Sequence, residues 1–330
     1  MNDPLPTARD AQLGMLLWAV IVGLSFPAVA LLSEGLPPML LTAIRFSVAA
    51  AAIAPLMLRS SDFWPGGIGF ALYTVLGVAL AFFFGAMFWA AHRSTPLSMS
   101  AIYVSVPLLA YFFGRMLAVE QPAGSLLGVL ALGAAGALGL VWAGAEGRAD
   151  RLSFGLGEAV YFFGCMASAT YPVLSKWGLA KGWLSDRAEV RTFWSLVSGS
   201  ILVGLLGFIF ENPARLARMT TLDTSIVVYL GLFSSGLTFW LTQRAAAVLT
   251  PGVITAYSYL VPLVSMVWLF AEDSDRIGGH WLPGSLTVLL AIALLLGRED
   301  AGHRFSLRSA AAHRQRSAMP DQPRRAVAKS

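Results

Sequence analysis

The chain has 330 residues, of which 57% are hydrophobic and 12% are charged, and its mean hydropathy is +0.69. Soluble domains carry about 25% charged residues, so this composition excludes an ordinary soluble protein. The single cysteine, Cys165, excludes an intramolecular disulfide. The net charge of +5 equals that of residues 298–330, so the basic pI describes this tail and does not indicate a nucleic-acid partner.

Ten apolar runs follow one another along the chain, separated by short segments rich in Gly, Pro and charged residues. A helix needs about 20 apolar residues to cross the hydrocarbon core of a bilayer. The sequence therefore predicts an all-α integral membrane protein. Its ten transmembrane helices are expected at residues 12–33, 37–58, 66–91, 97–119, 123–144, 154–178, 190–210, 224–247, 251–272 and 279–297.

The distribution of Lys and Arg in the loops predicts the orientation. With the N-terminus inside, the cytoplasmic side carries 15 of these residues, eight of them in the tail, against 6 outside. The tail decides the count, because without it the numbers are 7 and 6. We expect a multi-pass protein of the bacterial inner membrane, with residues 1–11 and a disordered basic tail at 298–330 both cytoplasmic.

Two stretches of the chain nearly repeat each other. Residues 95–109, TPLSMSAIYVSVPLL, and residues 250–264, TPGVITAYSYLVPLV, are identical at six of 15 positions. Phe26-Pro27 likewise matches Tyr171-Pro172. These pairs predict two five-helix repeats, at 12–144 and 154–297, joined by a loop at 145–153. Because five is odd, the second repeat enters the membrane from the opposite side, as in many secondary transporters.

Four prolines lie inside predicted helices, at Pro27, Pro107, Pro172 and Pro262. Proline removes a backbone donor and clashes with the carbonyl one turn back. In lipid the freed carbonyl needs a partner, so these helices are expected to face protein or a wet cavity. The alternative is that the four prolines only kink their helices and mark no cavity.

The repeated stretch also predicts a polar helix face. Thr255, Ser258, Pro262 and Ser265 share one face, and their counterparts are Ser100, Tyr103, Pro107 and Ala110. We expect these two faces to form the walls of one central cavity. The alternative is that small hydroxyl residues only let the helices pack closely.

Candidate substrate contacts are the polar and aromatic residues on these faces and on neighbouring helices, although each aromatic has the alternative of filling space or facing lipid. They are Trp18, Ser25, Phe84, Phe88, Ser100, Tyr103, Phe163, Thr170, Tyr171, Thr238, Thr255, Ser258 and Tyr259.

Several short patterns resemble the EamA family of the drug/metabolite transporter superfamily. They are Trp18, Gly23 and Phe26, then Leu36-Pro-Pro38, Arg45-Phe46, Val106-Pro-Leu108, Glu120, Gly128, the run at 136–139 and Ser258-Tyr-Leu-Val-Pro-Leu263. The resemblance implies ten helices in two repeats, and export as the direction of transport. The chain departs from it at Ala271-Glu272-Asp273, where the family usually has Gly-Glu, and its last helix is poor in glycine.

Charged residues inside the spans are few. Arg45 lies near the middle of the second helix and is a possible contact for a substrate carboxylate. The resemblance favours a structural role, since arginine at this place is similar among relatives with different substrates. Glu158 and His92 are possible groups for proton coupling, although both lie close to helix ends.

These features favour a permease. No acid–base pair or metal-ligand spacing occurs at membrane depth, so we expect no enzyme, no catalytic residue, no metal and no cofactor. The expected partners are the bilayer and a small-molecule substrate, with no nucleic acid and possibly a monomeric state. The predicted substrate is an amino acid or a similar net-neutral, partly apolar solute, exported by alternating access. Efflux of lipophilic drugs or cations, or a structural or signalling role, are the alternatives.

Overall fold

The computed structural model describes residues 6–60, 62–144, 155–272 and 278–298, and this part of the chain contains helices and no strands. The bounds are α1 Ala8–Ala30, α2 Pro38–Met57, α3 Gly67–Ala91, α4 Pro96–Tyr103, α5 Val106–Met116, α6 Gly124–Gly144, α7 Leu156–Ala180, α8 Ala188–Phe210, η2 Pro213–Arg218, α9 Thr221–Tyr229, η3 Leu230–Leu237, α10 Thr238–Ala246, α11 Pro251–Ala256, η4 Tyr257–Tyr259, α12 Leu260–Glu272 and η6 Gly279–Trp281, followed by a last helix at 282–298.

Eight helical segments within the described residues are long and apolar enough to cross a membrane. The segment Pro251–Val267 is a shorter apolar helix. The 25-residue α7 is long enough to span but is not among the eight. The chain is therefore an all-helical membrane protein, and a helix lies at each of the ten predicted positions. The eight spans are Ala8–Ala30, Pro38–Met57, Gly67–Ala91, Pro96–Met116, Gly124–Gly144, Ala188–Phe210, Thr221–Ala246 and Gly279–Arg298.

Two predicted continuous helices are interrupted, which corrects the sequence analysis. The predicted helix 97–119 is α4 and α5, separated at residues 104–105. The predicted helix 251–272 is α11, the short 3-10 turn η4, and α12. Each break precedes a proline, Pro107 or Pro262, which has no N–H to continue the α-helical ladder. The predicted helix 224–247 is covered by α9, η3 and α10, of which η3 is π-helical.

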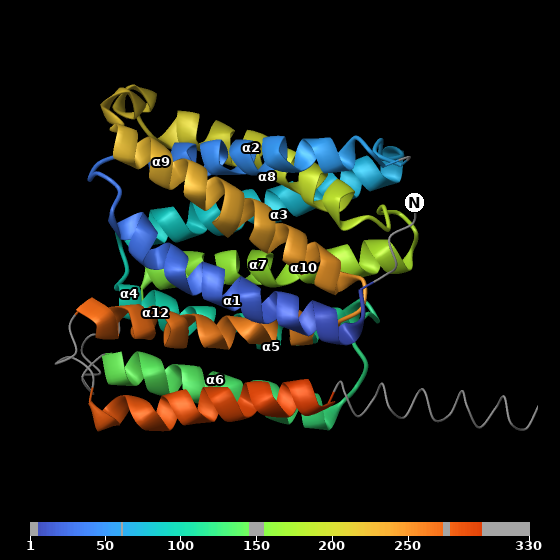
Figure 1. Cartoon of the computed structure of the whole chain (residues 1–330), viewed down its shortest axis with the longest axis vertical. Coiled ribbons are helices and arrows are strands. Elements are labelled where there is room, and N and C mark those ends of the chain that lie inside the picture. Colours follow the sequence, from blue (N-terminus) through green and yellow to red (C-terminus); the bar gives the residue numbers. More distant parts are fainter. Residues whose placement is uncertain (1–5, 61, 145–154, 273–277, 299–330) are drawn as a thin grey trace, which may run out of the picture.

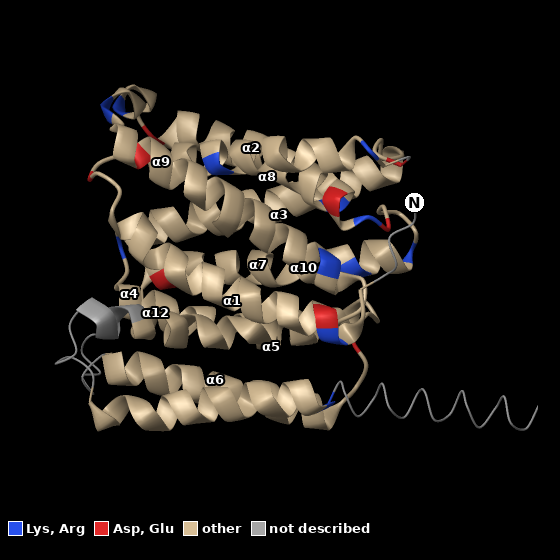
Figure 2. Cartoon of the chain, in the orientation of Figure 1, with Lys and Arg blue, Asp and Glu red and all other residues tan. Residues whose placement is uncertain are grey.

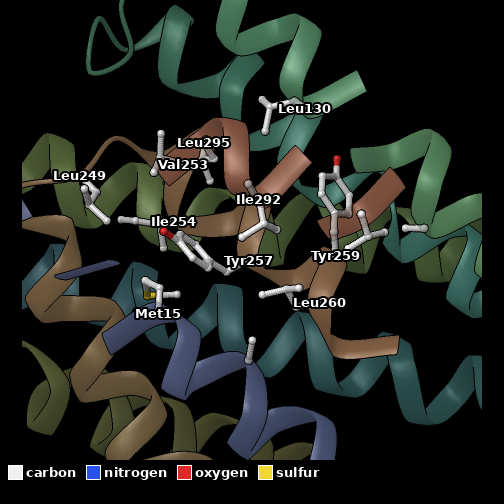
Figure 3. Close-up of a cluster of buried hydrophobic side chains, with 14 of the residues drawn as sticks. Met15, Leu130, Leu249, Val253, Ile254, Tyr257, Tyr259, Leu260, Ile292 and Leu295 are labelled. Carbon is white, nitrogen blue, oxygen red and sulfur yellow. The ribbon is translucent and has the colours of Figure 1, made fainter. Parts of the chain in front are cut away.

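The helices lie side by side in one bundle (Figure 1). In the middle, α2 packs on α8 and η3, α3 packs on α7 and α8, α1 packs on α10 and α12, and α5 packs on α7 and α11. At the lower edge of the view, α6 and the last helix border a large apolar cluster. Its residues include Met15, Leu130, Tyr257, Ile292 and Leu295 (Figure 3).

Charged residues lie mainly towards the two ends of the bundle (Figure 2). Hydrogen bonds join loops there. At one end Ser185 Oγ donates to Asp62 Oδ2, and Trp194 Nε1 donates to the Phe63 carbonyl at 2.8 Å. A second set of bonds joins Ser33 to Asp223, and the Glu211 carboxylate accepts from the first amides of α2 at 2.8 and 3.0 Å. These bonds connect segments from opposite halves of the chain.

Candidate substrate site

The two interrupted helices carry matching hydroxyl groups. Ser100 Oγ in α4 donates to the Pro96 carbonyl at 2.8 Å. Thr255 Oγ1 in α11 donates to the Pro251 carbonyl at 2.8 Å. Ser100 is exposed, Thr255 is partly buried and Ser258 in η4 is buried. The hydroxyls of Ser100 and Thr255 thus have local acceptors. Their role in binding stays a prediction.

Aromatic side chains from five helices form a connected array. Tyr171 contacts Phe239 with ring centroids 5.5 Å apart, and Phe239 lies 5.7 Å from Phe46. Phe46 lies 5.3 Å from Phe84. Phe84 continues to Phe88, and through Phe83 to Tyr103. The array joins four candidate residues, Tyr171, Phe84, Phe88 and Tyr103. The sequence analysis missed its central members Phe46 and Phe239, which come from the second and eighth predicted helices.

Other candidate residues lie elsewhere. Tyr259 packs on α6, where a Cβ at Gly133 would lie 2.4 Å from its ring, and it belongs to the apolar cluster (Figure 3). Phe163 is 55% exposed on α7, beside Phe162. Trp18 packs against the apolar cluster from α1. The hydroxyls of Ser25, Thr170 and Thr238 donate to carbonyls of their own helices.

A buried polar network surrounds the Tyr171 hydroxyl. Gln243 Nε2 donates to it at 2.8 Å, and Ser195 Oγ lies 2.9 Å away. Gln243 is in turn held by Arg191, whose Nε donates to Gln243 Oε1 at 3.1 Å. Arg191 lies within the predicted helix 190–210, and the structure places it inside α8 with no exposed surface. Its partner Gln243 is 52 residues away along the chain, so no local pattern indicates this burial.

Arg45 lies in α2 opposite the π-helical segment η3. Its Nη2 donates to Ser234 Oγ at 3.2 Å and to Ser235 Oγ at 3.4 Å. The side chain is partly buried, and its Nε has no hydrogen-bond partner among the described residues. The sequence did not predict that Ser234 and Ser235 lie beside Arg45.

The candidate coupling groups lie near helix ends. The Glu158 carboxylate accepts from the Gly155 amide at 2.9 Å at the start of α7. His92 follows α3, and its Nδ1 lies 3.0 Å from the Phe88 carbonyl. A buried acid that the sequence analysis used only for resemblance is Glu120, whose Oε2 accepts from the Gly252 amide at 3.0 Å at the start of α11. The described residues contain no cluster of His, Cys, Asp or Glu that could hold a metal ion.

A bundle of apolar helices with hydroxyls, aromatics and an arginine in its interior defines a multi-pass membrane protein with polar groups at bilayer depth. Residues 155–297 match the model of the EamA-like transporter family. The chain is 20% identical over 308 residues to an uncharacterized transporter, YcxC of Bacillus subtilis (strain 168), with 86% of this chain and 91% of that protein covered. A crystal structure at 20% identity has a TM-score of 0.69, over 88% of this chain and 97% of that one, and so shares the fold.

Over residues 155–297 the chain is therefore similar to the EamA-like transporter family, and over most of its length to a transporter. This confirms the resemblance. The chain is a multi-pass membrane protein that is similar to transporters.

Proposed function

We propose that the protein is a secondary transporter that exports amino acids or similar net-neutral, partly apolar solutes by alternating access. The observation that carries the proposal is the pairing of helix contacts. Counted along the described residues, α4–α5 is the fourth helix, α7 the sixth, α8 the seventh, α9–η3–α10 the eighth and α11–η4–α12 the ninth.

Each main contact between these helices has a counterpart five helices away. The third and sixth helices pack together, as do the eighth and first. The third packs on the seventh, and the eighth on the second. The fourth packs on the sixth, and the ninth on the first. Such pairing supports ten helices in two inverted repeats, a construction that lets two halves exchange shapes during transport.

The interrupted helices support the same mechanism. The fourth and ninth helices both break just before a proline in the repeated stretch. Discontinuous helices near the bilayer midplane expose backbone amides and carbonyls that hold charged groups of a solute. The aromatic array, which reaches Tyr103 beside the break in the fourth helix, suits an apolar side chain. A net-neutral solute with both features is the class that this interior fits best.

Release of solutes from proteoliposomes tests the proposal. Vesicles holding the full chain are loaded with a mixture of amino acids, organic acids and amines, with and without a proton gradient. Mass spectrometry identifies what leaves faster than from protein-free vesicles. We expect selective release of neutral amino acids. Release of amines alone would favour cation efflux instead, and no selective release under either condition would discard the proposal.

A further inference from the structure

Arg45 in α2 and Arg191 in α8 differ in their hydrogen bonding. Arg191 is fully buried, and all three of its guanidinium nitrogens donate. Nε and Nη2 reach the side chain and the carbonyl of Gln243, and Nη1 reaches the carbonyl of Ser185. All the guanidinium nitrogens of Arg191 thus have partners within the protein. Its role is structural, because these bonds connect α8 to α10 and to the loop before α8.

Arg45 is not saturated in this way. Only Nη2 is bonded, to the two hydroxyls of Ser234 and Ser235, while Nη1 makes no hydrogen bond to a described residue and Nε is buried without a partner there. Among the same residues no carboxylate pairs with Arg45. An arginine near the middle of a membrane helix with no anion beside it is costly and marks a functional position. Its unfilled donors and its charge both call for an anionic ligand.

The segment facing Arg45 is built in an unusual way. η3 is π-helical, and π-helical turns occur frequently at functional sites. Gly231 brings η3 close to α2, since a Cβ there would lie 2.9 Å from Val48 and 3.1 Å from the Arg45 carbonyl. Thr238 Oγ1 donates to the Ser234 carbonyl at 2.6 Å, so this carbonyl is engaged within its own helical segment. The serine hydroxyls are left facing the guanidinium.

We propose that Arg45, Ser234 and Ser235 bind the carboxylate of the transported solute. This inference rests on the proposed transport function and narrows its substrate class to solutes that carry a carboxylate. The guanidinium presents a planar fork of donors that matches the two oxygens of a carboxylate. The serine hydroxyls add neutral donors on the adjoining side. The bound carboxylate pairs with the guanidinium of Arg45 and so lowers the cost of that charge at membrane depth.

Competition in the proteoliposome assay tests this site without any substitution. L-leucine and L-phenylalanine are each compared with their primary amides, which keep the side chain and the ammonium group but lack the carboxylate. We expect both acids to inhibit release and the amides to have no effect. Amides that compete as well as the acids would overturn the inference.

Substitution of the arginine gives the second arm. Arg45→Gln is expected to raise the half-saturating concentration of L-leucine about 10- to 100-fold, the loss typical of a charged hydrogen bond, and Arg45→Lys is expected to lose less. Ser47→Ala is the matched control, because Ser47 lies on the same helix and contacts Ser200 Oγ at 2.8 Å instead of the guanidinium. Folding is checked by thermal unfolding in detergent. A folded Arg45→Gln protein with an unchanged half-saturating concentration would contradict the assignment.

The two proposals fail in different ways. Release confined to solutes without a carboxylate would overturn the role of Arg45 and leave transport standing. Release of no solute would remove the transport proposal, and this inference with it. If Arg45→Gln does not fold, the comparison of acids with amides on the unaltered protein decides.

Discussion

Pro27 leaves a gap in the hydrogen bonding of α1 that another helix fills. Proline at position 27 cannot donate to the carbonyl of Gly23, one turn earlier. Ser265 Oγ of α12 donates to that carbonyl at 3.0 Å. Gly23 also permits the close approach, since a Cβ there would lie 2.6 Å from Val264. Three residues from two helices therefore form one structural unit.

A double-mutant cycle checks this unit. Ser265→Ala should lower the free energy of unfolding by about 0.5–1.5 kcal/mol, the range for hydrogen bonds between membrane helices. Pro27→Ala restores the amide donor within α1, so the same serine substitution should then cost almost nothing. The measurement is unfolding of the detergent-solubilised protein by denaturant. If Ser265→Ala lowered the free energy of unfolding equally with Pro27 and with Ala at position 27, the serine would not compensate for the hydrogen bond that Pro27 removes.

The sequence predicted a carbonyl in need of a partner and a polar position at Ser265, but it did not predict that the two are in contact. It indicated that proline-freed carbonyls need partners, and it placed Ser265 on a polar face with Ser258. The contact joins residues 242 positions apart, and helical periodicity describes only one helix at a time. The same limit explains why the partners of Arg45 and of Arg191 were missed.

At the scale of elements, glycines of α6 let neighbouring helices pack closely against it. Gly136 receives the backbone of the last helix, where a Cβ would lie 2.8 Å from the Val288 amide. Gly133 receives the ring of Tyr259, 2.4 Å from the position of a Cβ. Gly128, on the same helix, has open space around it. The fifth helix thus packs against its neighbours through positions that have no side chain.

Two alanine substitutions on α6 separate packing from helix propensity. Gly133→Ala should destabilise the protein by about 1–3 kcal/mol, because the new methyl group overlaps the Tyr259 ring in a closely packed region. Gly128→Ala meets nothing, so it should be neutral or raise the stability by up to about 1 kcal/mol through better helix propensity. Thermal unfolding in detergent measures both. Equal effects at the two positions would mean that Tyr259 moves away without cost.

The positions of the elements were largely predictable, and their irregularities only in part. Runs of about 20 apolar residues located the helices because the bilayer fixes their length. Pro107 and Pro262 indicated disturbed helices, and the structure shows a two-residue turn before one and a short 3-10 turn before the other. The π-helical turn at η3 had no predicted counterpart. It depends on how Gly231 and Gly236 approach α2, which is a tertiary contact.

For the whole molecule, the central question is whether the face around Thr255 is reached by water. A transporter requires access to this face, whereas a packed structural bundle would keep it dry. Thr255 is partly buried in the structure, and its neighbour Ala256 is 2% exposed. The two adjacent positions therefore offer an internal comparison.

Thiol labelling measures this access. Cys165 is first replaced by alanine, and Thr255→Cys and Ala256→Cys are then made separately in that background. A hydrophilic thiol reagent should label position 255 and spare position 256, and a transported amino acid should slow the labelling of 255. No labelling of 255 from either side of the membrane would argue for a dry, packed interface and against the proposed cavity.

The glycine face of α6 has a consequence for how the protein is made. Its contacts at Tyr259 and Val288 come from the second half of the chain. At about 5–20 residues per second, a ribosome needs roughly 10–30 s to add the roughly 150 residues that separate Gly136 from Val288. During that time we expect the newly inserted fifth helix to lack these two contacts. We therefore expect the first half of the chain to reach its final packing only after Tyr259 and Val288 have been added.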